Sequence, residues 1–259
     1  MVEKILVDEG TLGKKINEGG PLAACSINRV VVLQPSYLPW IGYFEQIARA
    51  DQFVFLDDVQ FTRRDWRNRN KIRTREGWAW LTVPIEQKNR YTQMLKETRI
   101  DNSTNWNKKH CESIRLNYSR APFFEMYYPY FDSVYRKRWE FLLDLCYETT
   151  GYLKETLNIN TPTYKSSELP VGGVKADLIL NICQQMKASH YLTGSLARDY
   201  LSKEDFSQKG IDLEYQEYDH PKYSQRYSGF VPNLSLIDLL FNAGDKSLDV
   251  IMHTTTKQN

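Results

Sequence analysis

Two short runs of consecutive apolar residues, 30–33 and 53–56, are the clearest structural signal in the chain. Both are rich in β-branched or aromatic side chains, which is typical of strands that are covered on both faces of a parallel sheet. Between them, Ile41, Phe44 and Ile47 fall on one face of a predicted helix, while Glu45 and Arg49 form an i,i+4 pair on the opposite face. The order strand, loop, helix, strand predicts a right-handed parallel βαβ unit.

The later residues extend this fold class. Residues 78–83 indicate a strand that ends before Pro84, and most of residues 104–157 have helical periodicity. Helices over 176–186, 203–209 and 234–241 then alternate with strands over 190–193 and 211–215. The sequence therefore predicts an α/β protein with a parallel-sheet, Rossmann-like core and a helical middle region.

We interpret residues 28–259 as a single α/β domain with a helical insertion at about 104–157. Residues 1–27 carry glycine turn signals and little periodicity, so we expect a flexible N-terminal arm. No apolar run approaches the roughly 20 residues that cross a bilayer, and we expect no membrane span. The N-terminus lacks the apolar core of a secretory signal, which favours the cytoplasm.

Composition narrows the possible partners only slightly. A net charge of +2 gives no reason to expect nucleic acid or an anionic membrane as a general partner. The 17 tyrosines and 6 tryptophans suit stackable ligands such as sugars or nucleotides, but they also serve ordinary cores. The four cysteines are scattered and no histidine has metal-ligand spacing to another, so we expect neither a disulfide nor a metal site.

The loop of residues 34–43 follows the first strand and leads into the first helix. Open parallel sheets place ligands at this position, and a helix N-terminus suits a phosphate or a carboxylate. The alternative is that the loop's aromatic side chains plug the core beneath it. The candidate ligand-binding or catalytic residues of this loop are Gln34, Tyr37, Trp40, Gly42 and Tyr43.

Asp57 and Asp58 end the second predicted strand, beside the same loop if the βαβ unit is correct. Adjacent carboxylates in an extended chain point to opposite faces, so we expect only one of them, Asp57, to act in a site. It could accept a proton, bind a hydroxyl group or hold Mg²⁺ through water. The alternative is a carboxylate that caps the strand end.

Residues 60–73 carry six cationic residues against one acid, with two aromatic residues among them. Arginine forks and lysine ammonium groups bind phosphates, so this stretch is a candidate diphosphate site. A solvated basic face is the alternative, and a single-stranded nucleic-acid groove is the least favoured interpretation because the patch is short. The candidate binding residues are Gln60, Trp66, Asn68, Arg69, Asn70 and Lys71, with Arg67 beside them.

Two further groups lie near the predicted carboxyl edge of the sheet. Gly194 and Ser195 follow the strand at 190–193, and Asp199 and Tyr200 come shortly after them, so they form a candidate second wall of a ligand site. An ordinary turn into a helix is the alternative. His220 is a candidate acid or base, although a lone histidine is more often structural.

Several motifs resemble the WbqC-like family. Its opening block is similar to Gln34-Pro35-x-Tyr37-Leu38-Pro39-Trp40-x-Gly42-Tyr43-Phe44, Asp57-x-Val59-Gln60-Phe61 and Trp66-x-Asn68-Arg69-Asn70. Its closing block is similar to Tyr191-Leu192-x-Gly194, Asp199-Tyr200, His220-Pro221-x-Tyr223 and Leu234-Ser235-x-Ile237-Asp238. The resemblance covers about residues 30–244.

The resemblance implies a role in bacterial surface-polysaccharide, or O-antigen, biosynthesis. We expect transfer of an aminoacyl, glycyl-like or other acyl group to the amine of a nucleotide-linked amino sugar. The expected partners are that amino sugar and an acyl or aminoacyl donor, with ATP and Mg²⁺ as the candidate cofactor. A non-catalytic scaffold that binds a nucleotide or a glycan is the alternative.

A weaker resemblance concerns adenylating α/β nucleotidyltransferases, which carry His-x-Gly-His where this chain has Trp40-Ile41-Gly42-Tyr43. Both histidines are missing, while the glycine that would let a phosphate approach is present. The fold expectation is thus also nucleotidyltransferase-like. In the working hypothesis Asp57, Tyr43 and His220 are catalytic, and Asn68, Arg69 and Lys71 clamp the phosphates.

Overall fold

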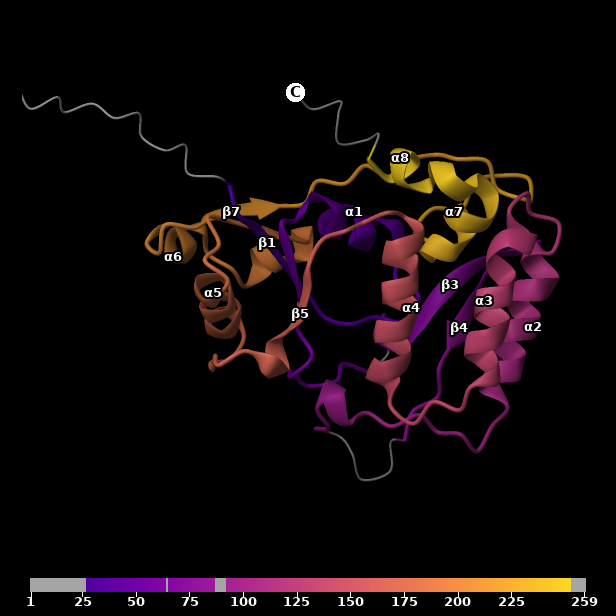
Figure 1. Ribbon diagram of the computed structural model, residues 1–259, viewed down its shortest axis with the longest axis horizontal. Helices are drawn as coiled ribbons and strands as arrows, with labels where there is room; N and C mark the ends of the chain where they lie inside the picture. The colour runs from indigo at the N-terminus through magenta and orange to yellow at the C-terminus, as the bar shows by residue number, and fades with distance from the viewer. Residues whose placement is uncertain (1–26, 64, 87–91, 253–259) are drawn as a thin grey trace, which may run out of the picture.

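A five-stranded parallel sheet forms the centre of the fold (Figure 1). The computed structural model describes residues 27–63, 65–86 and 92–252. The strands run in the order β5–β2–β1–β6–β7, and every neighbouring pair is parallel. Their bounds are β1 (Arg29–Leu33), β2 (Gln52–Phe55), β5 (Thr163–Lys165), β6 (His190–Thr193) and β7 (Asp212–Tyr215). The predicted α/β class with a Rossmann-like parallel core is confirmed.

The strand order reverses beside β1. The chain runs from β1 through α1 (Ile41–Arg49) to β2 and later to β5 on one side, and then crosses to β6 and β7 on the other. A reversal of this kind opens a crevice at the carboxyl ends of the two strands that flank it. Residues that follow β1 and β6 therefore face one another.

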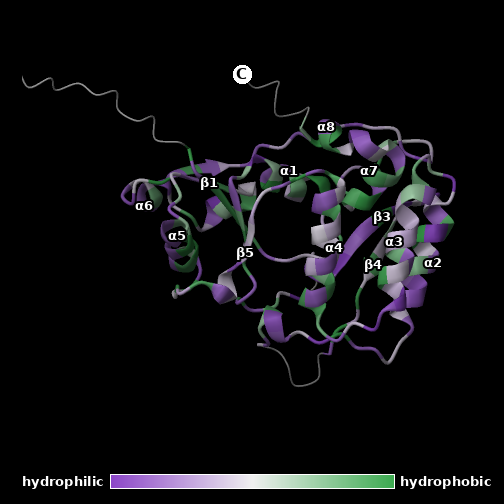
Figure 2. Ribbon diagram, in the orientation of Figure 1, coloured by the Kyte–Doolittle hydropathy of each residue, from purple (hydrophilic) through white to green (hydrophobic). Residues whose placement is uncertain are grey.

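Alternate residues of the strands enter two separate cores. Val30, Val32 and Val54 pack with α5 (Ala176–Gln185) and α6 (Lys203–Ser207). Val31 and Phe53, which are register partners, enter the larger core on the opposite face. A strand covered on both faces must be apolar throughout, and Figure 2 shows β1 as mainly hydrophobic.

The larger core is built by the helical middle region and the C-terminal helices. These helices are α2 (Trp106–Tyr118), α3 (Phe124–Arg136), α4 (Leu142–Thr156), α7 (Leu236–Ala243) and α8 (Ser247–Met252). Short 3₁₀ turns lie at η1 (Leu95–Glu97), η2 (Ser166–Glu168), η3 (Ser195–Asp199) and η4 (Gly244–Lys246). The expectation that residues 104–157 are mainly helical agrees with α2, α3 and α4.

A separate two-stranded antiparallel sheet carries most of the basic stretch. The strand predicted over 78–83 is β4 (Gly77–Thr82), and it pairs with β3 (Arg69–Thr74), a strand that has no clear apolar run. Figure 2 shows β3 as largely hydrophilic. The hairpin lies beside α7 and α2 rather than in the parallel sheet (Figure 1).

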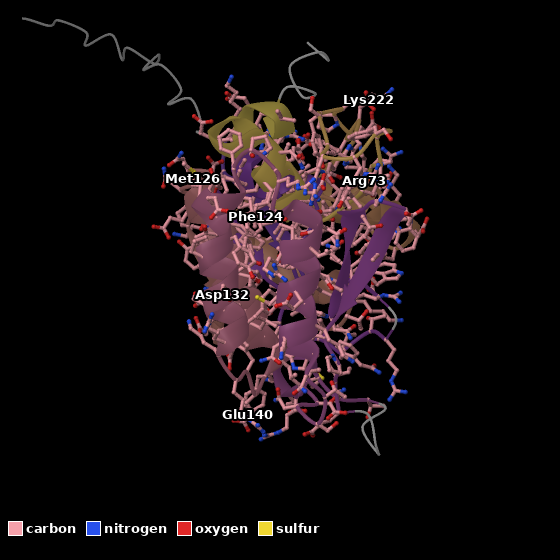
Figure 3. The ribbon with its side chains drawn as sticks, turned by 90° about the vertical axis from the view of Figure 1, so that its right-hand side faces the viewer. Arg73, Phe124, Met126, Asp132, Glu140 and Lys222 are labelled. Carbon is pink, nitrogen blue, oxygen red and sulfur yellow. The ribbon has the colours of Figure 1, made fainter. Side chains whose placement is uncertain are left out.

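Hydrogen bonds of two buried charged residues hold the segment of residues 216–235 against this hairpin and α7. Arg73 donates to the carbonyl oxygens of Ser228 and Gly229 at 2.7 and 3.0 Å, and it lies at the same end of the molecule as Lys222 (Figure 3). Asp238, fully buried on α7, accepts hydrogen bonds from Tyr118 and Tyr223 at 2.9 Å each. The segment is thereby held across the hairpin.

The carboxyl group of Asp238 is expected to titrate near pH 6. Burial raises its pKa to about 6, although hydrogen bonds from Tyr118, Tyr223 and Gln225 act in the opposite direction. Because the folded-state pKa exceeds the unfolded value, the stabilisation is complete below the unfolded pKa and is lost as pH rises through about 6. Carbon-13 NMR of the side-chain carboxyl group measures this titration, and a midpoint at or below that of Asp57, whose pKa is lowered, would contradict it.

Candidate functional site

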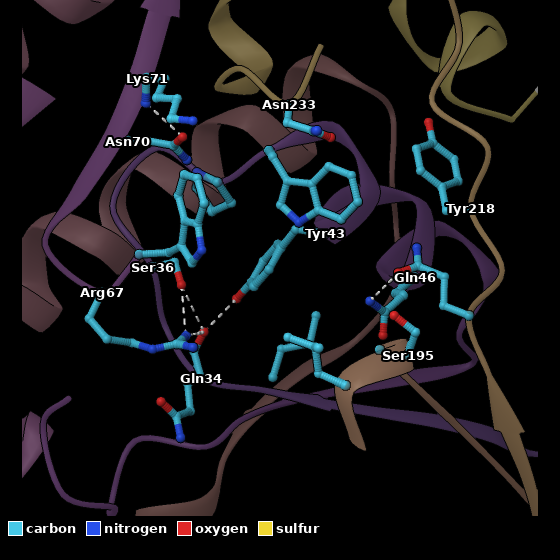
Figure 4. Close-up of a pocket in the computed structure, with 17 residues that line it drawn as sticks. Gln34, Ser36, Tyr43, Gln46, Arg67, Asn70, Lys71, Ser195, Tyr218 and Asn233 are labelled. Carbon is cyan, nitrogen blue, oxygen red and sulfur yellow. Dashed lines mark hydrogen bonds between the residues drawn. The ribbon is translucent and has the colours of Figure 1, made fainter. Parts of the chain in front are cut away.

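A cavity of about 500 Å³ lies where the strand order reverses (Figure 4). It is bounded by the end of β1 and the loop after it, by residues that follow β6 and β7, by α1, and by the start of β3 with the segment that leads into it. The lining residues are Leu33, Gln34, Ser36, Pro39, Trp40, Tyr43, Gln46, Trp66, Arg67, Asn70, Lys71, Gly194, Ser195, Leu196, Gln216, Tyr218 and Asn233. This is the position at which open parallel sheets bind ligands.

The hairpin holds the loop between β1 and α1 in place. The Tyr37 amide donates to the Arg67 carbonyl at 3.1 Å, and Nδ2 of Asn70 donates to the Leu38 carbonyl at 2.6 Å. Leu38 has a φ of 45°, in the left-handed region that a branched side chain adopts only when its surroundings enforce it. The cavity wall at Gln34 and Trp40 depends on these contacts.

Arg67 organises one wall of the cavity. One guanidinium nitrogen donates to the Gln34 carbonyl at 3.2 Å and to Oγ of Ser36 at 2.9 Å. The Tyr43 hydroxyl donates to the same carbonyl at 3.5 Å (Figure 4). Burial raises the pKa of Tyr43 well above its ordinary value, against the lowering effect of the Arg67 charge. Tyr43 therefore stays protonated and acts as a hydrogen-bond donor rather than as a base.

Lys71 lies among three indole rings at the side of the cavity. Its Nζ is 4.3 Å from the ring centre of Trp78, 5.2 Å from that of Trp80 and 5.6 Å from that of Trp66. The negative faces of these rings attract the ammonium group. Because Trp66 and Trp78 are partly exposed, the ammonium group lies at a boundary between the cavity and solvent.

Side-chain amides form a hydrogen-bonded chain on the opposite wall. Nε2 of Gln46 donates to Oε1 of Gln216 at 2.9 Å, and Nε2 of Gln216 donates to the Gly42 carbonyl at 2.8 Å and to Glu45 at 2.6 Å. The predicted Glu45–Arg49 pair is present at 3.1 Å, but Glu45 is buried rather than solvated. Neither Gln46 nor Gln216 was predictable from the sequence, because side-chain amides have no distinctive spacing.

About half of the residues expected at the site line the cavity. Those in the wall are Gln34, Trp40, Tyr43, Trp66, Asn70, Lys71, Gly194 and Ser195. Those outside the wall are Tyr37, Gly42, Asp57, Gln60, Asn68, Arg69, Asp199, Tyr200 and His220. Arg67, which was expected beside the candidates of the basic stretch, also lines the wall, and Ser36, Gln46, Gln216 and Tyr218 join it. The position of a residue near the carboxyl edge of the sheet thus predicted the cavity lining better than its residue type did.

Tyr37 and Gly42 serve the loop itself. Tyr37 is fully buried, and its hydroxyl lies 2.9 Å from Nδ1 of His110 and hydrogen-bonds to Tyr135, which is the core-plug alternative. A Cβ on Gly42 would lie 2.4 Å from the indole carbons of Trp40. The Trp40 ring therefore fills the space above Gly42, so the glycine admits this ring, and the approach of a phosphate to Gly42 stays a prediction.

Asp57 is a buried strand-end cap. Its carboxylate accepts hydrogen bonds from the Ser167 amide and hydroxyl at 2.9 and 2.8 Å, from Ser166 at 3.0 Å and from Tyr147 at 2.7 Å. Burial raises the pKa of Asp57, but these hydrogen bonds outweigh burial and the pKa is lowered. An ionised carboxylate with four donors and no place in the cavity wall does not fit the expected role of base.

His220 has both ring nitrogens engaged. Nδ1 donates to the Pro221 carbonyl at 2.9 Å, and Nε2 accepts from the Asn233 amide at 3.1 Å. The ring also stacks at 6.5 Å on Trp40, and burial lowers the pKa of the imidazole. His220 is thus a neutral support for two wall residues, Trp40 and Asn233, rather than an acid or base that faces the cavity.

The remaining expected residues lie outside the wall for different reasons. Asn68 is buried and donates to the Val83 carbonyl at 2.8 Å, and the Arg69 guanidinium lies 4.3 Å over the ring of Trp80. Gln60 is exposed in an isolated bridge to Met94. Asp199 and Tyr200 are exposed in and after η3. Arg67 and Lys71, rather than Arg69, are the cations beside the cavity.

The wall has a distinct chemical character. Its cations are Arg67 and Lys71, its rings are contributed by tyrosine and tryptophan, and side-chain amides supply most other polar groups. No carboxylate lines the cavity within residues 27–63, 65–86 and 92–252, and the same residues contain no cluster of three or more potential metal ligands. This lining favours an anionic ligand with a ring and several hydroxyl or amine groups.

Comparison with known proteins places the chain in a family. The model of the WbqC-like protein family matches residues 34–250. The chain belongs to this family. A relative, the uncharacterized protein Rv1507c of Mycobacterium tuberculosis, is 35% identical over 229 residues, which cover 88% of this chain and 99% of the relative. No solved structure was found to match. In the described part of this WbqC-like chain, no helix has the length and apolarity that a bilayer crossing needs.

Replacing Gly42 with alanine is expected to displace the Trp40 ring from the cavity wall. The new Cβ would overlap the indole, and such overpacking lowers the free energy of unfolding by about 1–3 kcal/mol. Chemical denaturation and tryptophan fluorescence measure the two effects. Gly151→Ala is the matched control, since nothing lies within 4 Å of that Cβ position and alanine favours a helix by up to about 1 kcal/mol. Equal stability of both variants would contradict the close contact.

Asp57→Asn is expected to lower stability without weakening a ligand bound in the cavity. An amide NH₂ group would face hydroxyl donors that now point at a carboxylate oxygen, with a cost of about 1–3 kcal/mol. The lowered pKa of Asp57 means that its stabilisation is present above the unfolded pKa and is lost as pH falls through the folded value. Denaturation of both proteins at several pH values tests this. The exposed Asp199→Asn serves as the control.

Proposed function

We propose that the cavity binds a nucleotide-linked amino sugar and that the protein transfers an acyl or aminoacyl group to its amine, in the biosynthesis of a bacterial surface polysaccharide such as O-antigen. Membership of the WbqC-like family supports the pathway. The single observation that carries the ligand class is the cavity lining, which combines two cations, aromatic rings and amides at the sheet's ligand-binding edge and offers no carboxylate among the described residues.

The charges of the wall suit a diphosphate. Arg67 and Lys71 approach the cavity from one side, and phosphate oxygens accept strong charge-assisted hydrogen bonds from such groups. The aromatic rings of Trp66 and Tyr218 offer flat apolar surfaces against which a base or a sugar ring can stack. The amides of Gln34, Gln46 and Asn233 suit hydroxyl and amine groups.

In the proposed transfer, the amine nitrogen attacks the carbonyl carbon of an activated acyl group. A C–N bond forms, the bond from that carbon to the leaving group breaks, and the amine proton leaves with the departing thiolate or phosphate. The Tyr43 hydroxyl, which stays protonated, turns away from the Gln34 carbonyl at 3.5 Å and donates its one proton to the developing oxyanion. The chain's contribution is then mainly binding and orientation.

The donor is a coenzyme A thioester or an acyl group activated by ATP with Mg²⁺. ATP fits the cationic wall by the same chemistry as a nucleotide sugar. The wall lacks carboxylate ligands in the described residues, so it does not fit a protein-held Mg²⁺.

A non-catalytic scaffold that binds the same ligand is the second candidate. It is favoured by one observation, that Asp57 and His220, the acid–base candidates, are saturated by internal hydrogen bonds away from the cavity. The two functions predict the same binding and differ only in turnover. Incubation with labelled acyl donors, followed by mass spectrometry of the amino sugar, separates them.

Lys71→Met is expected to weaken binding of a uridine diphosphate amino sugar by about tenfold, because it removes one charge-assisted contact while keeping an apolar stem against the indoles. Isothermal titration calorimetry measures the affinity. Arg115→Met, which removes the same charge from an exposed position on α2, is the control. Equal affinity of wild type and Lys71→Met, or no binding of any nucleotide sugar at millimolar concentration, would overturn the proposed ligand.

A further inference from the structure

The side chain of Gln46 has a polar atom without a hydrogen-bond partner among the described residues. Gln46 lines the cavity from α1, and only 4% of the residue is exposed (Figure 4). Its Nε2 donates to Gln216, while its Oε1 is buried and has no hydrogen-bond partner within residues 27–63, 65–86 and 92–252. A buried acceptor without a donor is costly, so this oxygen of a cavity-lining residue points to a donor that the described chain does not supply.

The orientation of this amide is fixed from behind the wall. Nε2 of Gln216 lies 2.8 Å from the Gly42 carbonyl and 2.6 Å from the Glu45 carboxylate, and a carbonyl and a carboxylate paired with a cation only accept hydrogen bonds. Glu45 is itself paired with Arg49 at 3.1 Å. Gln216 must therefore present its oxygen to Gln46. It follows that Gln46 must present its nitrogen to Gln216 and its oxygen elsewhere.

We propose that Oε1 of Gln46 accepts a hydrogen bond from an N–H or O–H group of the ligand, and that it makes the cavity select a ligand with a donor at this place. The hydrogen bonds from Gln46 to Gln216 and from Gln216 to Glu45 have a fixed direction. The Gln46 amide therefore cannot rotate to present its nitrogen to a ligand acceptor. The chemical class of the group is an amine or a hydroxyl of a sugar.

This inference rests on the proposed function and deepens it, because it names the wall residue that meets the amine or hydroxyl. Gln46 is a positioning residue in this scheme. An amine that donates one hydrogen to Oε1 is held in place, and its lone pair remains directed away from that bond. Arg67 and Lys71 would meet the phosphates, while the amide chain would meet the sugar.

The test uses titration calorimetry of the full chain with uridine diphosphate hexoses that carry an amine, a hydroxyl or a fluorine at C2, C3 or C4 in turn. At one position we expect the amine or hydroxyl compound to bind about tenfold tighter than the fluorinated one. Gln46→Met, which keeps length but not the acceptor, should abolish that difference and leave the fluorinated compound's affinity within about twofold. If the amine compound binds more tightly than the hydroxyl compound, the amine is the hydrogen-bond donor to Oε1.

Gln52→Met is the matched control, because Gln52 lies at the amino end of β2 and bonds to Asn28 and Met186, away from the cavity. It should retain the full difference between donor and fluorine. The proposal is overturned if the difference is the same in Gln46→Met as in wild type. It is also overturned if the hexoses bind but no position shows a difference.

Failure of every hexose to bind would overturn the proposed function instead. The orientation of the Gln46 amide is then tested by a separate measurement. A crystal structure of the unliganded full chain at about 1.2 Å resolution or better distinguishes amide nitrogen from oxygen. Oε1 facing the cavity with an ordered water that donates to it supports the inference. Nε2 facing the cavity overturns it.

Discussion

The attachment of the β1–α1 loop to the β3–β4 hairpin is the constraint on which the candidate site depends. The loop has a buried leucine, Leu38, at a φ of 45°, a conformation that costs of the order of 1–3 kcal/mol and persists only where its surroundings enforce it. The bonds from Asn70 to Leu38 and from Tyr37 to Arg67 enforce it, and both come from residues 67–70. The same short segment also brings Arg67 and Lys71 to the cavity, so loop shape and cavity charge have one origin.

The parts of the fold that were predictable are those with a strong apolar signal. Residues 30–33 and 53–56 are buried on both faces, and only a continuous apolar run satisfies that condition. β3 has no such run, since Asn70 and Arg73 fill buried positions with polar groups whose partners are carbonyl oxygens. Its basic residues therefore resembled a charged surface in the sequence. The short edge strand β5 is largely exposed and gave little signal either.

The location of the candidate site was predictable, but the role of each side chain was not. The sheet-end rule depends only on topology, which the strand and helix pattern supplied. Whether a carboxylate at a strand end acts in a site or only caps the strand depends on hydrogen-bond partners that are far away in the sequence. Ser166 and Tyr147, which saturate Asp57, are 109 and 90 residues from it, and Asn233 is 13 residues from His220. No local sequence pattern predicts contacts between residues that are so far apart in the chain.

The three buried acids of the described structure, Glu45, Asp57 and Asp238, all lie outside the cavity wall. Each accepts several hydrogen bonds and so fixes which way its donors point: Glu45 orients Gln216, Asp57 orients Tyr147, and Asp238 orients Tyr118 and Tyr223. The wall is thus left with cations, rings and amides, whose field attracts an anion. Of the three acids only Glu45 orients a wall residue, Gln216, and because a carboxylate accepts but does not donate, Glu45 determines the direction of the hydrogen bonds from Gln46 to Gln216 and from Gln216 to Glu45.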